Sequence, residues 1–292
     1  MDTVKFCKRL DTIPNDFLNQ EQEVNWQGLL WQRKAKYKYQ VIIKNLRVTL
    51  YYKEFSIENS LHKFYHNNNY SIFTFKQMVD SIAVLDNYFD FSIYDADVIK
   101  YTPGLVVDAT PEDSYLTWID YKAKKILPMV DRKNGKVYGG YFKAGQVKIK
   151  GYNKTYEANK KLHKDEKITD ALFRFEAEVY AKYIAKTYGL SILKVSDLVN
   201  YEKYCKSLEL LLTFYDRIKK DRLDHTMLDC RQYRTLGIFL NSNLSHQFKL
   251  NHPHTHKSER TKFNALLKDQ TYQKADTVRE EICHTINTMK TF

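Results

Sequence analysis

The spacing of apolar residues changes along this chain, and the change limits the folds that are open to it. Up to about residue 180, apolar and polar residues often alternate, as at Val48, Leu50 and Tyr52, which is typical of strands with one buried face. From there on the spacing is helical, most clearly over residues 195–220. Strands first and helices afterwards predict an α+β protein, with a mostly antiparallel sheet flanked by helices and then a helical C-terminal part.

We therefore expect a sheet-containing core over residues 1–190 and a mainly helical region over residues 191–292, either as two domains or packed as one. The local signals predict, in chain order, an edge strand over 1–10, strands over 26–32 and 38–55 with a turn at Lys44-Asn45, a helix over 74–89 capped by Thr74, a strand over 96–109 interrupted at Pro103-Gly104, a helix that starts near Pro111, and a helix over 180–189 ended by Gly189.

The charge balance points to a polyanionic partner. The chain carries 47 Lys and Arg against 35 Asp and Glu, a net charge of +12, and nucleic acid is the commonest partner of such a protein. Its 23 tyrosines and 16 phenylalanines offer rings on which bases can stack. The alternative is that Tyr, Phe, Lys, Asn and Ile are frequent because the genome is rich in A and T, since the bias runs along the whole chain.

Several other classes of protein are disfavoured. The four cysteines are widely spaced, which fits free thiols better than a zinc site or a disulfide framework. No apolar run reaches transmembrane length and the first residues contain no apolar signal core, so we expect a cytoplasmic protein without a membrane partner. The chain has neither a Walker-type motif nor GxGxxG, the glycine-rich sequences that bind nucleotides. We therefore expect no ATP-driven motor in this chain, and a DNA partner would need a separate helicase for strand separation.

Two neighbouring strand patterns each turn one charged face outward. Alternation gives residues 147–154 a face that carries Lys148, Lys150, Tyr152 and Lys154, and gives residues 172–179 a face that carries Leu172, Arg174, Glu176 and Glu178. If the two strands pair antiparallel with their apolar faces inward, Tyr152 and Lys154 lie beside Arg174 and Glu176. We expect this face of the sheet to be open to solvent.

Tyrosine, lysine and carboxylate together suit the cleavage of a phosphodiester. The Tyr152 hydroxyl can attack a DNA phosphate and keep it as a covalent ester, but its ordinary pKa of about 10 calls for help from a cation or a metal. Lys154 can lower the cost of the phenolate and of charge on the phosphoryl oxygens. The carboxylates can hold Mg²⁺ or Mn²⁺. The alternative is a set of ordinary cross-strand ion pairs, each contributing about 0.2–1 kcal/mol.

Four stretches occur in an order that a known family shares. They are ENSLHKFYHNNNYSIFTF (58–75), VIKYTPGLVVD (98–108), VKIKGYNKTYE (147–157) and ALFRFEAEVYAKYIAKTYGLSILKVSDLVN (171–200). In this order they resemble replication initiators of the filamentous-phage gene II/X type, including plasmid and phage relatives from Bacteroidetes, over about residues 36–220. Tyr-x-Lys and Arg-Phe-Glu are weak motifs alone, and their order and spacing make the likeness specific. It implies a Rep-like α+β core with an antiparallel sheet.

The resemblance implies an enzyme that initiates rolling-circle replication of a phage or plasmid. Such enzymes nick one strand at a specific site, keep a 5′-phosphotyrosyl link and release a 3′-OH primer. By this resemblance Tyr152 matches the nicking tyrosine, Lys154 its paired lysine and Glu176 the acid of the Arg-Phe-Glu strand. It implies Mg²⁺ or Mn²⁺ as the cofactor, and origin DNA, single- and double-stranded, with a host helicase and polymerase as partners.

The DNA itself would be held by polar side chains around this face. The candidate DNA contacts are His62, Lys63, Asn69, Lys148, Lys150 and Arg174. For residues 62–69 the alternative is plain turn chemistry, because Asn tolerates left-handed backbone conformations. We expect a DNA affinity that falls steeply with salt and a cleavage rate that rises in the mildly alkaline range, where a phenol loses its proton more readily.

One position departs from the family pattern. Thr102 stands near the place of an acidic residue, so a metal ligand is either missing or supplied by Asp108, Glu54 or Glu178. The alternative function is therefore a catalytically inactive, sequence-specific DNA-binding protein of replication or regulation.

A second candidate for metal binding lies nearer the C-terminus. His252, His254 and His256 alternate, but Pro253 and the polar flanking residues favour a solvated loop over a set of metal ligands.

Overall fold

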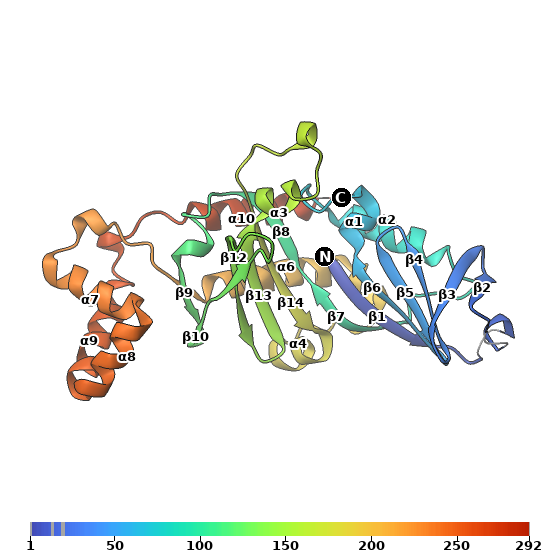
Figure 1. Cartoon of the computed structure of the whole chain (residues 1–292), viewed down its shortest axis with the longest axis horizontal. Coiled ribbons are helices and arrows are strands. Elements are labelled where there is room, and N and C mark those ends of the chain that lie inside the picture. The colour runs from blue at the N-terminus through green and yellow to red at the C-terminus, as the bar shows by residue number, and fades with distance from the viewer. Residues whose placement is uncertain (1, 13–14, 19–20, 292) are drawn as a thin grey trace.

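The computed structural model describes residues 2–12, 15–18 and 21–291. Over these residues the chain forms a large antiparallel sheet of 12 strands, helices that lie along it and a helical lobe at one end (Figure 1). This is the predicted α+β class, with the predicted helical C-terminal region. No helix within the described ranges combines the length and the apolar character needed to cross a membrane.

The strands of the large sheet run in the order β11-β12-β13-β14-β7-β1-β6-β5-β4-β3-β2, and β8 also pairs with β14. The predicted interruption of one strand falls at Pro103, between β7 and β8. The bounds are β1 Thr3–Arg9, β2 Glu23–Trp26, β3 Leu29–Ala35, β4 Lys38–Ile43, β5 Leu46–Tyr51, β6 Glu54–Ser60, β7 Asp97–Thr102, β8 Gly104–Asp108, β11 Leu127–Val130, β12 Val137–Ala144, β13 Val147–Asn153 and β14 Leu172–Tyr180.

Strand β1 lies in the middle of the sheet. It pairs with β6 on one side and with β7 on the other, so the expectation of an edge strand over residues 1–10 was wrong; Met1 itself lies outside the described residues. Val4 and Phe6 are fully buried, whereas Lys5 and Cys7 point to a half-covered face. A strand with one polar face has the same sequence pattern at the edge and in the centre, which is why the pattern did not reveal the position.

Turns and helix caps lie where the sequence predicts them. Lys44 and Asn45 join β4 to β5, and Lys44 has the left-handed backbone of a tight turn, with φ 54°. Helix α2 (Phe75–Asp86) begins with a capping box in which Thr74 is the N-cap. Helix α4 (Ala181–Tyr188) ends at Gly189, whose φ of 70° is readily available to glycine.

The helix expected near Pro111 is absent from the described structure of that segment. A single 3-10 turn (Tyr115–Thr117) leads into β9 (Trp118–Tyr121) and β10 (Lys124–Lys125), which form a small second sheet with β15 (Ile218–Lys220). Tyr115, Trp118 and Tyr121 are buried at intervals of three residues. That spacing imitates one face of a helix, which explains the wrong prediction.

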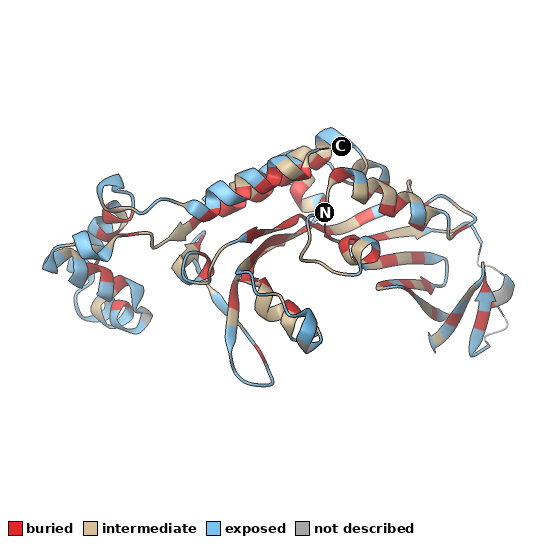
Figure 2. Ribbon diagram, turned by 90° about the horizontal axis from the view of Figure 1, so that it is seen from above, coloured by how far each residue is buried: buried red, intermediate tan, exposed pale blue. Residues whose placement is uncertain are grey.

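Helices cover the apolar face of the large sheet. Four of them come from the second half of the chain: α4, α5 (Val195–Leu198), α6 (Tyr201–Asp216) and α10 (Thr277–Met289). They share one hydrophobic core with the strands, and buried residues occur on both the helices and the sheet (Figure 2). Helix α10 packs against both β8 and α6. Because α10 returns to the sheet from near the end of the chain, the core does not stop at residue 190.

Three helices form a separate lobe beyond the small sheet (Figure 1). Helices α7 (Cys230–Leu240), α8 (Ser242–Asn251) and α9 (Pro253–Leu266) pack on one another around a second hydrophobic cluster that includes Phe239 and Phe263. The lobe therefore has a small core of its own.

The three alternating histidines lie at the start of α9, so the expected loop was wrong. Pro253 is the first helical residue, a position where its missing N–H does no harm. His256 is buried, and its Nε2 lies 3.3 Å from Ser245 Oγ. Residues two apart on a helix point in different directions, so His252, His254 and His256 do not converge on one ion.

Candidate functional site

Strands β13 and β14 pair antiparallel, as the sequence analysis expects for their charged faces to meet. Tyr152 lies opposite Arg174, Lys150 opposite Glu176 and Lys148 opposite Glu178. Since cross-strand partners have side chains on the same face, tyrosine, cations and carboxylates do come together here. This part of the prediction is confirmed for Lys148, Lys150 and Tyr152, whereas Lys154 lies beyond the end of β13, in helix α3 (Lys154–Asn159), so its predicted place on the strand was wrong.

The part of this face around Tyr152 is covered rather than open to solvent, which corrects the sequence-based expectation. The exposed fractions are 8% for Tyr152, 1% for Arg174 and 6% for Glu176. Asp2, just before β1, and Asn69, in the segment between α1 (Leu61–His66) and α2, make contacts with Arg174. The neighbours of Tyr152 are of both kinds: its ring lies 6.3 Å from that of Tyr138, and Lys154 Nζ lies 5.9 Å from the centre of its ring.

Arg174 is the centre of the buried polar cluster. Its Nε donates to Glu176 Oε2 at 2.8 Å and its Nη1 donates to the carbonyl oxygen of Asn69 at 2.7 Å. Its Nη2 lies 2.5 Å from Asp2 Oδ2, as an ion pair whose angle is poor for a hydrogen bond. Two carboxylates thus flank one guanidinium out of contact with water, which is stabilising only while all three charges stay together.

The remaining carboxylates of this face are also paired. Lys150 Nζ lies 2.9 Å from Glu176 Oε1 and 3.6 Å from Glu178 Oε2, and Lys100 Nζ lies 3.3 Å from Glu178 Oε1. Burial alone would raise the pKa of Glu176, but Arg174 and Lys150 lower it to about 2. The carboxyl of Glu176 is therefore ionised at any physiological pH.

Lys154 follows β13 as the first residue of α3 (Lys154–Asn159), and its side chain is fully buried. Its Nζ donates to Asn69 Oδ1 at 2.7 Å and to Glu157 Oε2. Burial and the charge of Arg174 lower the pKa of Lys154 to about 8, although Glu157 acts in the opposite direction. Lys154 therefore gains or loses its proton near physiological pH.

The pKa of Tyr152 is raised, where the sequence-based argument expected Lys154 to favour the phenolate. Burial is the largest cause and the charge of Glu176 adds to it, whereas Arg174 acts the other way. The phenol is thus protonated at rest, and any reaction through its oxygen must remove that proton during the reaction.

Two of the candidate DNA contacts lie beneath the surface. His62 is buried, with its Nε2 3.1 Å from Ser71 Oγ and its ring stacked on Phe73 at 4.9 Å. Arg174 is enclosed as described above. The other four, Lys63, Asn69, Lys148 and Lys150, are half-buried, so their side chains reach the surface at least in part.

The candidate metal ligands are not brought together. Asp108 lies opposite Leu172, four positions along β8 from Gly104, which faces Glu176. Glu54 pairs with Arg9 at the far end of β1. Over the described ranges, no three His, Cys, Asp or Glu side chains form a group that would hold a metal ion.

Sequence reasoning missed two acids of this cluster. Asp2 donates its N–H to the carbonyl oxygen of Thr102 at 2.9 Å, so its carboxylate stands next to the position where an acid was expected and threonine was found. Glu157 lies one helical turn after Lys154 in Tyr-x-Lys-x-x-Glu, so its spacing was a usable signal. Asp2 had no local signal, because its partner Arg174 is far away in the sequence.

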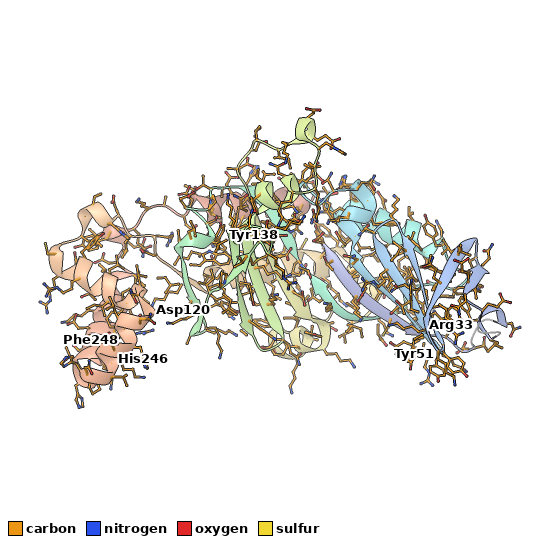
Figure 3. The ribbon with its side chains drawn as sticks, viewed as in Figure 1. Arg33, Tyr51, Asp120, Tyr138, His246 and Phe248 are labelled. Carbon is orange, nitrogen blue, oxygen red and sulfur yellow. The ribbon has the colours of Figure 1, made fainter. Side chains whose placement is uncertain are left out.

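Tyrosines and lysines border Tyr152. The ring of Tyr138, labelled in Figure 3, lies 6.3 Å from that of Tyr152 and 5.6 Å from that of Tyr156. Lys160 Nζ lies 5.0 Å from the centre of the Tyr138 ring, and Lys136 Nζ lies 4.7 Å from that of Tyr156. Half-buried rings with cations over them are suited to hold unpaired bases and their phosphates.

Gly139 provides the space for Tyr152, which gives a first prediction. A Cβ at position 139 would lie 2.3 Å from Tyr152 Cβ and 2.7 Å from the carbonyl oxygen of Gly151. We expect Gly139→Ala to lower the free energy of unfolding by about 1–3 kcal/mol, because backbone or Tyr152 must move. Gly237→Ala is the matched control, because a Cβ there meets nothing within 4 Å and α7 should gain about 0.5–1 kcal/mol. Equal stability of the two variants in urea would contradict the packing described here.

His62 makes stability depend on pH. Burial, followed by the charge of Arg174, lowers its pKa from 6.5 to about 2 in the folded protein. Below pH 6.5 the unfolded chain therefore binds a proton that the folded chain does not, and stability is lost as the pH falls. Between pH 6 and pH 5 we expect His62→Gln to lose about 1 kcal/mol less than the unmodified chain in urea unfolding. Parallel losses in the two proteins would show that His62 is not neutral and buried.

Comparisons with known proteins do not assign the chain to a family. The chain matches none of the protein-family models against which it was scanned, and a search of curated proteins also gave no match.

Proposed function

We propose that this chain is a DNA-nicking endonuclease and strand transferase that starts rolling-circle replication of a phage or plasmid. The observation that carries the proposal is that Tyr152 lies opposite Arg174 on the neighbouring strand, with Lys154 Nζ 5.9 Å from the centre of its ring and with the charge of Glu176 acting on its pKa. The Rep-like character of the core is part of the same proposal.

In this mechanism the Tyr152 oxygen attacks the scissile phosphorus. The bond from phosphorus to the 3′ oxygen breaks, the phenol gives up its proton, and the leaving 3′ oxygen takes one up, which yields a 3′-OH and a 5′-phosphotyrosyl ester. The charge of Arg174 offsets the negative charge that develops on the phosphoryl oxygens. A 3′-OH can later attack the ester and reseal the strand, so no ATP is consumed.

The pKa values support an alkaline optimum within this proposal. The neutral fraction of Lys154 grows as the pH passes about 8, and a neutral amine can take the phenol proton. The rate should therefore rise from neutral to mildly alkaline pH.

A requirement for Mg²⁺ or Mn²⁺ belongs to the proposal through the family resemblance, but the donor set does not fit a divalent ion in this arrangement. Asp2 and Glu176 are held by Arg174, and Glu178 is held by Lys100 and Lys150. We therefore assign no step of the reaction to a metal. The cations of the cluster supply the positive charge that the mechanism needs.

The second candidate is a sequence-specific DNA-binding protein that has lost cleavage. The threonine at position 102, the paired carboxylates and the raised pKa of Tyr152 favour it. It shares the basic surface and the border of tyrosines with the enzyme and differs from it only in chemistry.

Incubation with supercoiled plasmid carrying the origin of the same replicon separates the two functions. The enzyme yields nicked circles and a protein–DNA adduct that survives SDS, with Mg²⁺ or Mn²⁺ added or with EDTA as a parallel arm. The binding protein retards the DNA and leaves it intact. If the DNA is clearly retarded but no covalent adduct forms in either arm, the enzymatic function is excluded.

A further inference from the structure

A groove opens where the helical lobe joins the rest of the molecule. We call it the junction groove; its volume is about 540 Å³, and it is lined by β15 and the residues beside it, by the end of α9 and by the start of α10. Asp120, labelled in Figure 3, lies on β9 next to this junction, opposite Lys219 of β15.

Cations dominate the lining of the junction groove. The only acids among the lining residues are Asp216 and Asp276, and the cations are Arg217, Lys219, Lys220, Arg222, Lys268 and Arg279.

The two acids are already used. Asp216 binds Arg279, with Oδ1 2.8 Å from Nε, and Asp276 Oδ2 lies 3.4 Å from Arg222 and 3.7 Å from Lys220. No described carboxylate is within ion-pair distance of the three remaining cations, Arg217, Lys219 and Lys268. The groove therefore keeps an excess of positive charge that the chain itself does not neutralise.

This excess is held at an electrostatic cost. Burial lowers the pKa of Lys220 to about 8. Burial also lowers the pKa of Lys219, and Arg260 and Lys268 lower it further against the opposing charge of Asp120. An anion in the groove would relieve the repulsion, because it stabilises the charged form of each of these lysines.

The lining also indicates which anion fits. Its apolar members are Ile218 and Leu267, and it contains no aromatic ring on which a base would stack. A nucleotide site needs a contact to the base, whereas a sugar-phosphate backbone needs only spaced cations. The cations of the groove lie on and beside β15, after the end of α9 and at the start of α10. A continuous strand of phosphates needs cations that are spread in this way.

We propose that the junction groove binds the phosphate backbone of DNA, independently of base sequence. This goes beyond the proposed cleavage, because the groove shares no residue with the cluster around Tyr152 and requires no chemistry. The inference rests on the proposed function for its partner, which is the same DNA duplex, bound at a second place on the protein.

The test removes two exposed groove cations and keeps their aliphatic stems, in the double variant Arg217→Gln/Lys268→Gln. The double variant and the reference protein with an intact groove both also carry Tyr152→Phe, so that cleavage cannot disturb the measurement. Affinity for a dye-labelled duplex of arbitrary sequence is measured by fluorescence anisotropy over a series of salt concentrations. Each lost phosphate contact should reduce the slope of log K against log salt by about 1, so we expect a decrease of about 2 and a loss of affinity of about tenfold or more at low salt.

The matched control is Lys249→Gln/Lys257→Gln, two exposed lysines of the lobe that do not line the groove. It removes the same charge and should change the slope much less. An unchanged slope in the groove variant, or an equal change in both variants, would overturn the proposal. Melting temperatures of all variants exclude misfolding as the cause, and since no step needs cleavage, the result is readable even if the chain does not nick DNA.

Discussion

Tyr152→Phe should lower the rate of nicking by at least about a thousandfold and abolish the SDS-resistant adduct, because phenylalanine lacks the attacking oxygen. The ring, which fills its place beside Tyr138, is kept. We therefore expect the fold and the affinity for origin DNA to be unchanged. The measurement is single-turnover cleavage of supercoiled plasmid, with retardation of the same DNA as the binding readout.

Tyr138→Phe is the control for this variant. Its ring contacts that of Tyr152, and it differs from the unmodified chain by one hydroxyl as well. It should still form the adduct. If Tyr152→Phe cleaves as the unmodified chain does, the proposed nucleophile is wrong; if the adduct moves to another residue, the cluster around Arg174 is not the catalytic site.

Arg174→Met should have the largest effect on stability. The substitution leaves Asp2 without its cation and Glu176 with Lys150 alone, in a place where Arg174 is 1% exposed. Removing one partner from a buried ion pair costs on the order of 3–5 kcal/mol, because the remaining charge stays buried without compensation. The measurement is unfolding in urea followed by the fluorescence of the three tryptophans, all of which lie in the sheet-bearing part.

Arg47→Met provides the comparison at the surface. Arg47 also pairs with a glutamate on a neighbouring strand, at 2.7 Å from Glu58, but half of its side chain is exposed. Water screens such a pair, so its loss should cost no more than about 1 kcal/mol. Similar losses in the two arginine variants would mean that the cluster around Arg174 is hydrated and not closed off.

The charged faces of the two strands at the site could be predicted from the sequence because they depend on local information. Alternation assigns Tyr152 to the charged face of β13, and Arg174 and Glu176 to the charged face of β14. Because successive side chains of a strand point to opposite faces, each residue can lie only on one face or the other. The caps at Thr74 and Gly189 are local in the same sense, since a side chain or a φ angle decides them within one turn. Each of these features is specified within a few residues.

The cover over the site could not be predicted, because it is made by residues from distant parts of the chain. Asn69 reaches Arg174 and Lys154 from a segment that reads only as an Asn-rich turn. Asp2 reaches Arg174 because β1 is central, and nothing within residues 1–10 distinguishes a central strand from an edge strand. The expected exposure, and with it the expected direction of the Tyr152 pKa, failed for this reason.

The central place of β1 also determines when the site can form. Asp2 leaves the ribosome long before its partner Arg174 and before Glu176, which both lie on β14. Both strands that pair with β1, β6 and β7, are made before β14, but Asp2 and Arg174 are far apart in the chain, and contacts between such distant segments form slowly. A nascent or truncated chain that ends before β14 therefore carries the phenol of Tyr152 without the guanidinium that faces it, and the cluster around Arg174 can assemble only after β14 has been made.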